Sequence, residues 1–262
     1  MNKTYPSDLS DSQWNHIREF FEKTDPTRGR PQEIDLRKIV NACFYILVTG
    51  CQWRYLPIDL PKWQIVYYHF RKWQNTKMWK RINDTLRATA RVKAGKHKQP
   101  TAGAMDSQSV RNSSVAGESH GFDGGKKTKG RKRHIVVDTL GFLMAIIVTS
   151  AAVQDRDGAK LVLNRLDGSS KKLRKVWVDG GYRGVLLEWV KINFRFILEV
   201  VLRSDEATGF VVLPKRWIVE RTFAWLNNNR RMSKDYERFC QTSETFAYMA
   251  MSRLMLKRLS SS

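Results

Sequence analysis

Three acidic residues stand out by their position in the chain. Asp106 lies inside a segment that reads as a β-strand, where an unpaired buried charge would cost several kcal/mol. Asp179 follows the apolar residues 176–178 and precedes two glycines that allow a sharp turn. It therefore sits at the carboxyl end of a strand, where open α/β sheets bind their ligands. Glu220 lies within a segment of helical periodicity, predicted over residues 215–231.

Carboxylates that converge from three such elements could bind divalent metal ions. Their hard oxygens suit Mg²⁺, and two ions about 3.5–4 Å apart would stabilise both the attacking and the leaving oxygen of a phosphoryl displacement. The nucleoside triphosphate motif GxxxxGK[ST] is absent from the sequence, so no nucleotide cofactor is expected. Taken singly, each acid would more often be a solvated or ion-paired surface residue. The hypothesis of a metal site therefore depends on the three acids together.

The elements that must position these acids alternate in type after about residue 100. The residue patterns predict strands over 101–110, 134–138, 142–148, 176–178 and 196–201, and helices over 158–166, 184–192, 215–231 and 242–259. The second and third strands form a hairpin around the turn that ends at Gly141. Three consecutive strands come first, and the later strands alternate with helices. This order predicts a mixed α/β sheet flanked by helices.

The first ninety or so residues show helical periodicity instead. A Ser-x-x-Gln capping box begins a first amphipathic helix at Ser10. Further helices are predicted over 36–49, 63–73 and 78–92. Short helices at close intervals are typical of a helix-turn-helix-like bundle. The stretch 94–100 has no periodicity and reads as a linker, which divides the chain into a helical domain over 1–93 and an α/β domain over 101–262.

The charge balance indicates a polyanionic partner. The chain has 47 Lys and Arg against 25 Asp and Glu, a net charge of +22. An excess of this size favours nucleic acid, because each neutralised phosphate releases condensed counterions. Membrane surfaces also attract basic proteins, but the sequence shows no signal peptide, spanning helix or membrane anchor. We therefore expect a cytoplasmic protein that does not bind membranes.

Two sets of basic residues could contact DNA. In the helical segment, a helix lying on DNA would place Lys62, Arg71, Lys72 and Lys77 at phosphates, whereas in an ordinary bundle they would form a solvated face. A second set, just before the strand 134–138, would grip DNA unless it forms a solvated loop. It consists of Lys126, Lys127, Lys129, Arg131, Lys132 and Arg133. His134, which follows, could assist phosphate chemistry, although a lone histidine at the start of a strand is more often structural.

Four segments resemble the DDE transposases of bacterial insertion sequences, in particular the large group numbered four and five. They are residues 106–110, 130–138, 178–184 and 216–226, and the resemblance covers nearly the whole chain. It implies a ribonuclease-H-like catalytic domain in which Asp106, Asp179 and Glu220 bind two Mg²⁺ ions, with Mn²⁺ as a substitute. Arg216 matches an arginine of the family motif. Leu213 and Asn227 depart from a looser pattern that has a tyrosine and a basic residue there.

The same resemblance implies an activity and its partners. Water would cleave double-stranded DNA at the ends of an insertion element, and the freed 3′-hydroxyl would attack target DNA. The helical domain would recognise terminal inverted repeats or support assembly into a homodimer or larger oligomer, at the bacterial nucleoid. Two alternatives stay open: an inactive or domesticated relic that only binds DNA, and a simple ribonuclease-H-like nuclease. Further DNA contacts are expected from Arg216, Arg221, Arg230 and Arg231.

Overall fold

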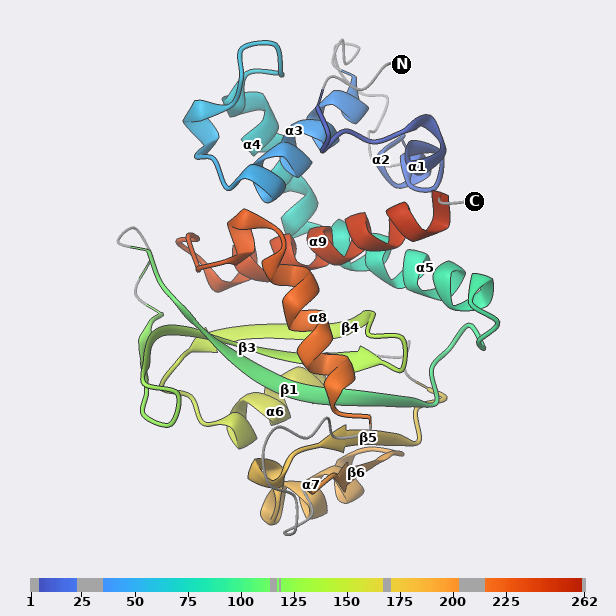
Figure 1. Ribbon diagram of the computed structural model, residues 1–262, viewed down its shortest axis with the longest axis vertical. Helices are drawn as coiled ribbons and strands as arrows, with labels where there is room; N and C mark the ends of the chain where they lie inside the picture. The colour runs from blue at the N-terminus through green and yellow to red at the C-terminus, as the bar shows by residue number, and fades with distance from the viewer. Residues whose placement is uncertain are drawn as a thin grey trace.

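The computed structural model describes residues 5–22, 35–113, 117, 119–166, 171–202 and 215–260. Its N-terminal part is helical and lies at the top of the view in Figure 1. The α-helices there are α1 (Asp11–Asn15), α2 (Arg18–Glu22), α3 (Leu36–Thr49), α4 (Trp63–Asn75) and α5 (Met78–Lys93), with a short 3-10 turn η1 (Trp53–Tyr55) between α3 and α4. The predicted capping box at Ser10 is present, and α3 ends at Gly50 in the left-handed conformation that favours glycine.

The remainder is a mixed sheet with helices on both faces. Its strands are β1 (Ala102–Arg111), β2 (Gly121–Asp123), β3 (Thr128–Asp138), β4 (Leu143–Ser150), β5 (Lys175–Val178) and β6 (Ile197–Val200). The order is β2-β3-β1-β5-β6, and β4 pairs with β3. Its helices are α6 (Asp155–Asn164), α7 (Val185–Asn193), α8 (Trp217–Asn227) and α9 (Cys240–Ser260), with the 3-10 turns η3 (Gly180–Tyr182) and η4 (Arg230–Met232). Strands β1, β3 and β4 are antiparallel, whereas β1, β5 and β6 are parallel.

This architecture confirms the predicted fold class and corrects several element boundaries. The first predicted helix is broken into α1 and α2 near Ile17, and the last turn of the predicted helix 215–231 is the separate η4. Strand β3 begins at Thr128 rather than at residue 134, so most of the run of cations belongs to a strand. Neighbouring strands explain this difference, because β1 and β2 both pair with the cationic part of β3.

The two faces of the sheet carry different hydrophobic cores. Side chains alternate along a strand, so neighbours on β1 point to opposite faces. Met105 packs with residues of α6 and α7, whereas Ala104 packs with residues of α8 and α9. Two residues after Ala104, Asp106 therefore lies on the face that α8 covers. This alternation decides which helix can bring a further functional group to Asp106.

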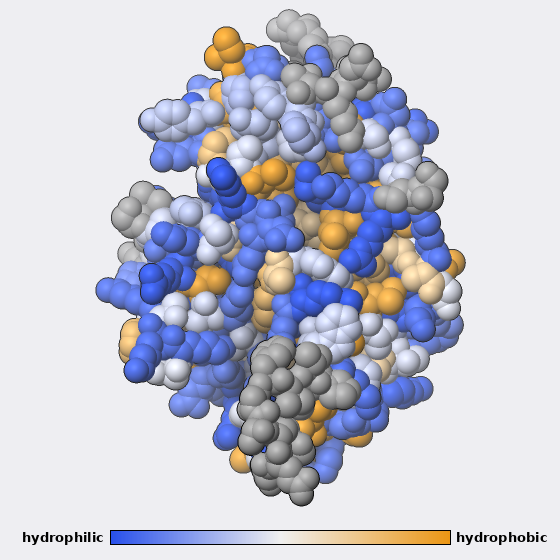
Figure 2. All heavy atoms as spheres, in the orientation of Figure 1, coloured by the Kyte–Doolittle hydropathy of each residue, from blue (hydrophilic) through white to orange (hydrophobic). Residues whose placement is uncertain are grey.

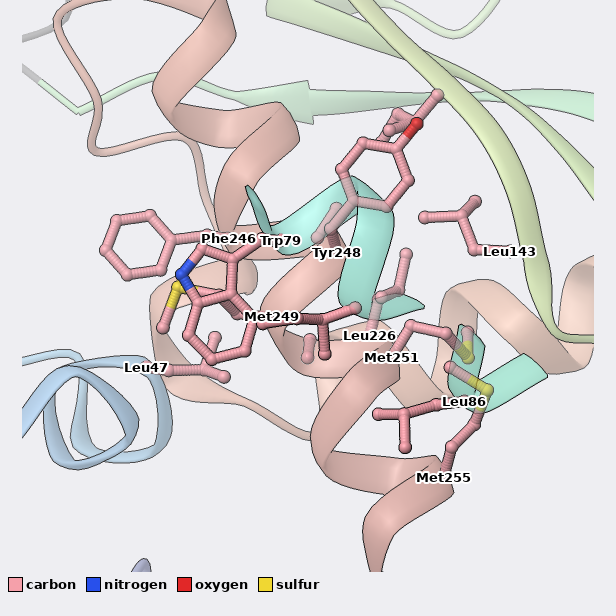
Figure 3. Close-up of a cluster of buried hydrophobic side chains, with 14 of the residues drawn as sticks. Leu47, Trp79, Leu86, Leu143, Leu226, Phe246, Tyr248, Met249, Met251 and Met255 are labelled. Carbon is pink, nitrogen blue, oxygen red and sulfur yellow. The ribbon is translucent and has the colours of Figure 1, made fainter. Parts of the chain in front are cut away.

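Helix α9 joins the helical part to the sheet. It contacts both α5 and β4, and Figure 1 shows it beside α5 above the sheet. Figure 3 shows its side chains Phe246, Met249 and Met255 within one buried cluster with Trp79 of α5 and Leu143 of β4. The division into domains at residues 94–100 stays a prediction, and the two parts share this core. Among the described residues, no helix is long and apolar enough to cross a membrane.

Candidate active site

The strand register brings Asp106 and Asp179 to the same level of the sheet. Strands β1 and β5 are parallel, and Ala104 is paired with Trp177. Asp106 of β1 and Asp179, directly after the end of β5, each follow that pair by two residues and lie on the same face. The Asp179 carboxylate accepts a hydrogen bond of 2.8 Å from the backbone N–H of Gly181, which fixes the turn after β5. A Cβ atom at Gly181 would lie 3.0 Å from the same carboxylate oxygen, so the glycine leaves room for it.

Helix α8 crosses this face and carries Glu220 in its first turn. The turn between β3 and β4 packs closely against α8. The Thr222 hydroxyl donates to the carbonyl oxygen of Gly141 over 2.8 Å. Gly141 has φ +84°, and a Cβ atom there would lie 2.9 Å from the Trp225 ring, so both its conformation and its packing favour glycine. The turn thus holds the middle of α8 against the sheet.

The three acids surround the guanidinium group of Arg216. Its Nη2 atom lies 3.9 Å from Asp106, 3.7 Å from Asp179 and 3.9 Å from Glu220. In the part of the chain that the structure describes, no group of three or more Asp, Glu, His or Cys side chains is close enough to hold a metal ion as it stands. The carboxylates therefore converge on one place, as the sequence predicts, but they are spaced around a cation.

Burial perturbs the pKa of the Asp106 carboxylate. Its side chain is 19% exposed, against 56% for Glu220. This burial raises the pKa of Asp106 to about 6, helped by the nearby negative charge of Asp179. The Ser107 backbone N–H donates to Asp106 over 2.7 Å and opposes the shift. A nearby cation, whether an arginine or a metal ion, would stabilise the ionised form of this carboxylate.

Asp106→Asn is expected to stabilise the protein in EDTA at neutral pH. A folded-state pKa above the unfolded value means that the ionised form destabilises the fold, so the wild type loses stability as pH rises from about 4 to about 6. Asparagine removes this loss, worth about 1–3 kcal/mol at pH 7. Urea unfolding of the two proteins should show a difference near zero at pH 4 that grows to a plateau above pH 6. Equal curves for Asp106→Asn and wild type would contradict the assignment.

Comparison with known proteins shows which family this chain belongs to. Residues 97–255 match the family model described as "Transposase DDE domain", and these residues include all three acids. The chain belongs to the transposase DDE domain family. Residues 9–83 match a second model, described as "Putative transposase of IS4/5 family".

One curated relative is similar over part of its length. It is the "Putative transposase for insertion sequence element IS402" from Burkholderia cepacia, 31% identical over 116 residues. The match covers 42% of this chain and 54% of the relative, so the chain spans about half the length of that protein.

A second polar network lies on the opposite face of β1, and its acids were not among the residues predicted from the sequence. The Ser107 hydroxyl donates to Asp155 over 2.8 Å, and Lys126 Nζ donates to the Ser107 carbonyl and hydroxyl oxygens over 2.9 Å. Lys132 Nζ lies 3.0 Å from both Asp123 and Asp155. Asp155 stands in the first turn of α6, where acids are common, and precedes the helix predicted over 158–166, so the sequence signal for it is weak.

Three of the six cations predicted to grip DNA are internal in the DDE domain. Arg131, Lys132 and Arg133 are each at most 4% exposed. Arg131 pairs with the buried Asp235, and Arg133 donates to the carbonyl oxygen of Met232. Side chains with so little surface cannot contact DNA in this conformation, so that prediction is wrong for these three residues. The physical reason is that β3 is an inner strand. Arg131 and Arg133 meet Asp235 and carbonyl oxygens of the chain around residue 235, whereas Lys132 meets Asp123 and Asp155 on the other face.

Two further predicted residues are also internal. Arg231 is 7% exposed and pairs with Glu237, so it is not placed to contact DNA. His134 is 1% exposed, and a Cβ atom at Gly158 would overlap its ring, which shows how closely α6 packs on it. Burial lowers the pKa of His134 to about 4, so its ring is neutral at pH 7. Both observations support the structural reading of His134.

Other predicted contact residues lie at or near the surface. Lys127, Lys129 and Arg230 are exposed, and hydrophilic side chains cover most of the α8 face of the molecule in Figure 2. Arg221 is held between the Trp217 and Trp225 rings, with its guanidinium carbon 4.2 and 4.5 Å from their centres. On α4, Arg71 and Lys72 are half-buried. Leu213, which departs from the family pattern, lies outside the described residues.

Proposed function

We propose that this chain is an insertion-sequence transposase that binds element ends, cleaves DNA by two-metal phosphodiester hydrolysis and joins the 3′-hydroxyl ends to target DNA. The observation that carries the proposal is the convergence of Asp106, Asp179 and Glu220 on one cation from three separate elements. Membership of the transposase DDE domain family supports the same reaction class.

The donor chemistry of the site suits magnesium or manganese. All three groups offer hard carboxylate oxygens, and the buried Asp106 together with its two neighbours presents more negative charge than Arg216 alone neutralises. We assign Asp106, Asp179 and Glu220 as the residues that would hold two such ions. When bound, the ions would lower the pKa of the attacking water and stabilise the charge that develops on the phosphate.

The protein itself would supply positioning and charge. The Gly181 N–H and the Ser107 N–H fix the two aspartates, and the contact of Thr222 with Gly141 fixes the helix that carries Glu220. The net charge of +22 would attract both element ends and target DNA. We assign recognition of terminal inverted repeats to the helical part, α1 to α5, and expect at least a homodimer on DNA because two ends must be joined.

The deciding experiment is incubation of the purified chain with labelled DNA that carries its element ends, in Mg²⁺, in Mn²⁺ and in EDTA. A working transposase gives metal-dependent cleavage and a joined product, both lost in Glu220→Ala. Binding without either product would indicate a DNA-binding relic. Nicked DNA that never yields joined product would indicate a simple nuclease.

Exchange of Lys127 and Lys129 for glutamine should weaken DNA binding about equally for all sequences. Both lysines are exposed: Lys129 lies on β3, and Lys127 directly precedes that strand. Each phosphate contact that is lost should reduce the slope of log K against log salt concentration by about one. Fluorescence anisotropy from 50 to 300 mM KCl would measure a slope reduced by about two. The matched double variant of the exposed Lys191 and Arg195, which lie on and after α7, removes the same charge elsewhere. Equal slopes for the two double variants would contradict this contact surface.

A further inference from the structure

The position of Arg216 is unusual for a residue that serves only to contact DNA. Its side chain is 19% exposed, and its guanidinium group lies within 4 Å of all three acids of the candidate active site. The nitrogen–oxygen distances of 3.7–3.9 Å are longer than a hydrogen bond, and no hydrogen bond accompanies these ion pairs among the described residues. The three carboxylates thus share one counter-charge that none of them binds tightly.

We propose that Arg216 is a built-in counter-cation that competes with divalent metal ions for Asp106, Asp179 and Glu220. It holds the three carboxylates near one another in the metal-free protein, and it leaves their centre when metal binds. This inference rests on the proposed metal-dependent function of the same site. It gives Arg216 a role in the protein before any DNA is bound.

Geometry makes the two states mutually exclusive. Magnesium requires its oxygen ligands at about 2.0–2.1 Å, which brings them much closer together than they stand around a guanidinium nitrogen. As they stand, no three acidic, histidine or cysteine side chains of the described chain are grouped closely enough to hold a metal ion. Closing the carboxylates on a metal ion would therefore remove the space that Arg216 Nη2 now occupies. The positive charges of the ion and of the guanidinium group add repulsion to this steric conflict.

The surroundings of Arg216 allow it to leave while α8 stays in place. Arg216 precedes the first residue of α8, where the positive end of the helix dipole disfavours a cation. The helix body is fixed separately, because Thr222 donates to Gly141 and Arg221 donates to the carbonyl oxygen of Leu140. Arg221 is also held between two indole rings, whereas no aromatic ring contact of this kind is found for Arg216 in the described part of the chain. Arg216 can therefore leave the three acids without movement of the α8 backbone.

The test is the affinity of the DNA-free, full-length chain for Mn²⁺, measured by calorimetry and by the electron paramagnetic resonance signal of unbound Mn²⁺. Arg216→Gln removes the competing charge and should tighten binding by about tenfold, within the usual range of coupling between competing equilibria. Lys215→Gln is the matched control, because it removes the neighbouring cation, whose Nζ lies 3.8 Å from Glu199 and not at the three acids. It should leave the affinity within about twofold of wild type. Arg216→Lys keeps the charge and should bind Mn²⁺ more weakly than Arg216→Gln.

A second measurement separates competition from simple misfolding. In EDTA, Arg216→Gln leaves three carboxylates facing one another without a counter-charge, so its melting temperature should fall below that of wild type. Saturating Mn²⁺ should remove this difference, since the metal ion replaces the lost charge. A variant that is damaged for other reasons would stay less stable with Mn²⁺, and that result would overturn the inference.

The outcomes also distinguish this inference from the proposed function. In one outcome the wild type binds Mn²⁺, Asp106→Ala does not, and Arg216→Gln binds Mn²⁺ as well as or more weakly than wild type. This result would refute the role of Arg216 and leave the assignment of the metal site intact. Failure of both wild type and Arg216→Gln to bind Mn²⁺ would refute both proposals. Binding by Arg216→Gln that exceeds wild type, and that vanishes when Asp106→Ala is added, supports both.

Discussion

Replacing Asp106, Asp179 or Glu220 by alanine is expected to abolish DNA cleavage while sparing DNA binding. Each variant removes carboxylate oxygens that we assign to the metal ions, and the stabilisation that such ions give to a phosphoryl transition state is worth several kcal/mol. Since 1.36 kcal/mol corresponds to tenfold in rate, each loss should be on the order of 10³-fold or more. Cleavage of labelled DNA in Mn²⁺ would measure the rate, and a gel-shift assay would measure binding.

Binding should survive because the triad is a small, negatively charged part of a strongly basic protein. Removing one carboxylate makes the net charge of +22 slightly more positive, so affinity for DNA should stay equal or rise. Glu199→Gln is a suitable control, because Glu199 lies on β6 of the same sheet and pairs with Lys175 and Lys215, not with Arg216. Cleavage by any alanine variant at a rate near that of the Glu199 control would refute its assignment as a metal ligand.

The largest loss of stability is expected from breaking the buried pair of Arg131 and Asp235. Both side chains are fully buried, and their nearest nitrogen and oxygen atoms lie 3.1 Å apart. Arg131 also donates to the carbonyl oxygens of Glu237 and Arg238, and Asp235 accepts from the Ser243 hydroxyl. Removal of one partner leaves the other charge unpaired in the interior, which lowers the free energy of unfolding by about 3–5 kcal/mol. Asp235→Leu should therefore lower the melting temperature by roughly 6–20 °C.

A double replacement tests whether the cost comes from the stranded charge. Arg131→Met combined with Asp235→Leu removes both charges, so it should be more stable than Asp235→Leu alone. The exposed pair of Lys191 and Glu188 provides a control, since breaking a surface pair costs about 0–1 kcal/mol. A double variant as unstable as Asp235→Leu would show that lost packing or hydrogen bonds, and not the unpaired charge, dominate.

The sequence by itself determined which residues stand where chemistry could occur. Asp179 could be identified because an apolar strand and two glycines flank it, and Glu220 because it lies in a helix with a clear apolar period. The helices α3, α4 and α5 were predicted within two residues at each end. These features are local, since periodicity, capping and turn residues act over a few neighbouring positions.

Only the tertiary structure decided which charges face solvent and which face one another. The cations of β3 looked like a DNA-binding run, yet Arg131 meets Asp235 and Lys132 meets Asp123 and Asp155. The place of Arg216 among three acids depends likewise on the register of β1 with β5 and on the path of α8. Partners of this kind come from elements far apart in the chain. A charge is read from the sequence one residue at a time, but its environment is set by whichever distant groups the fold packs against it.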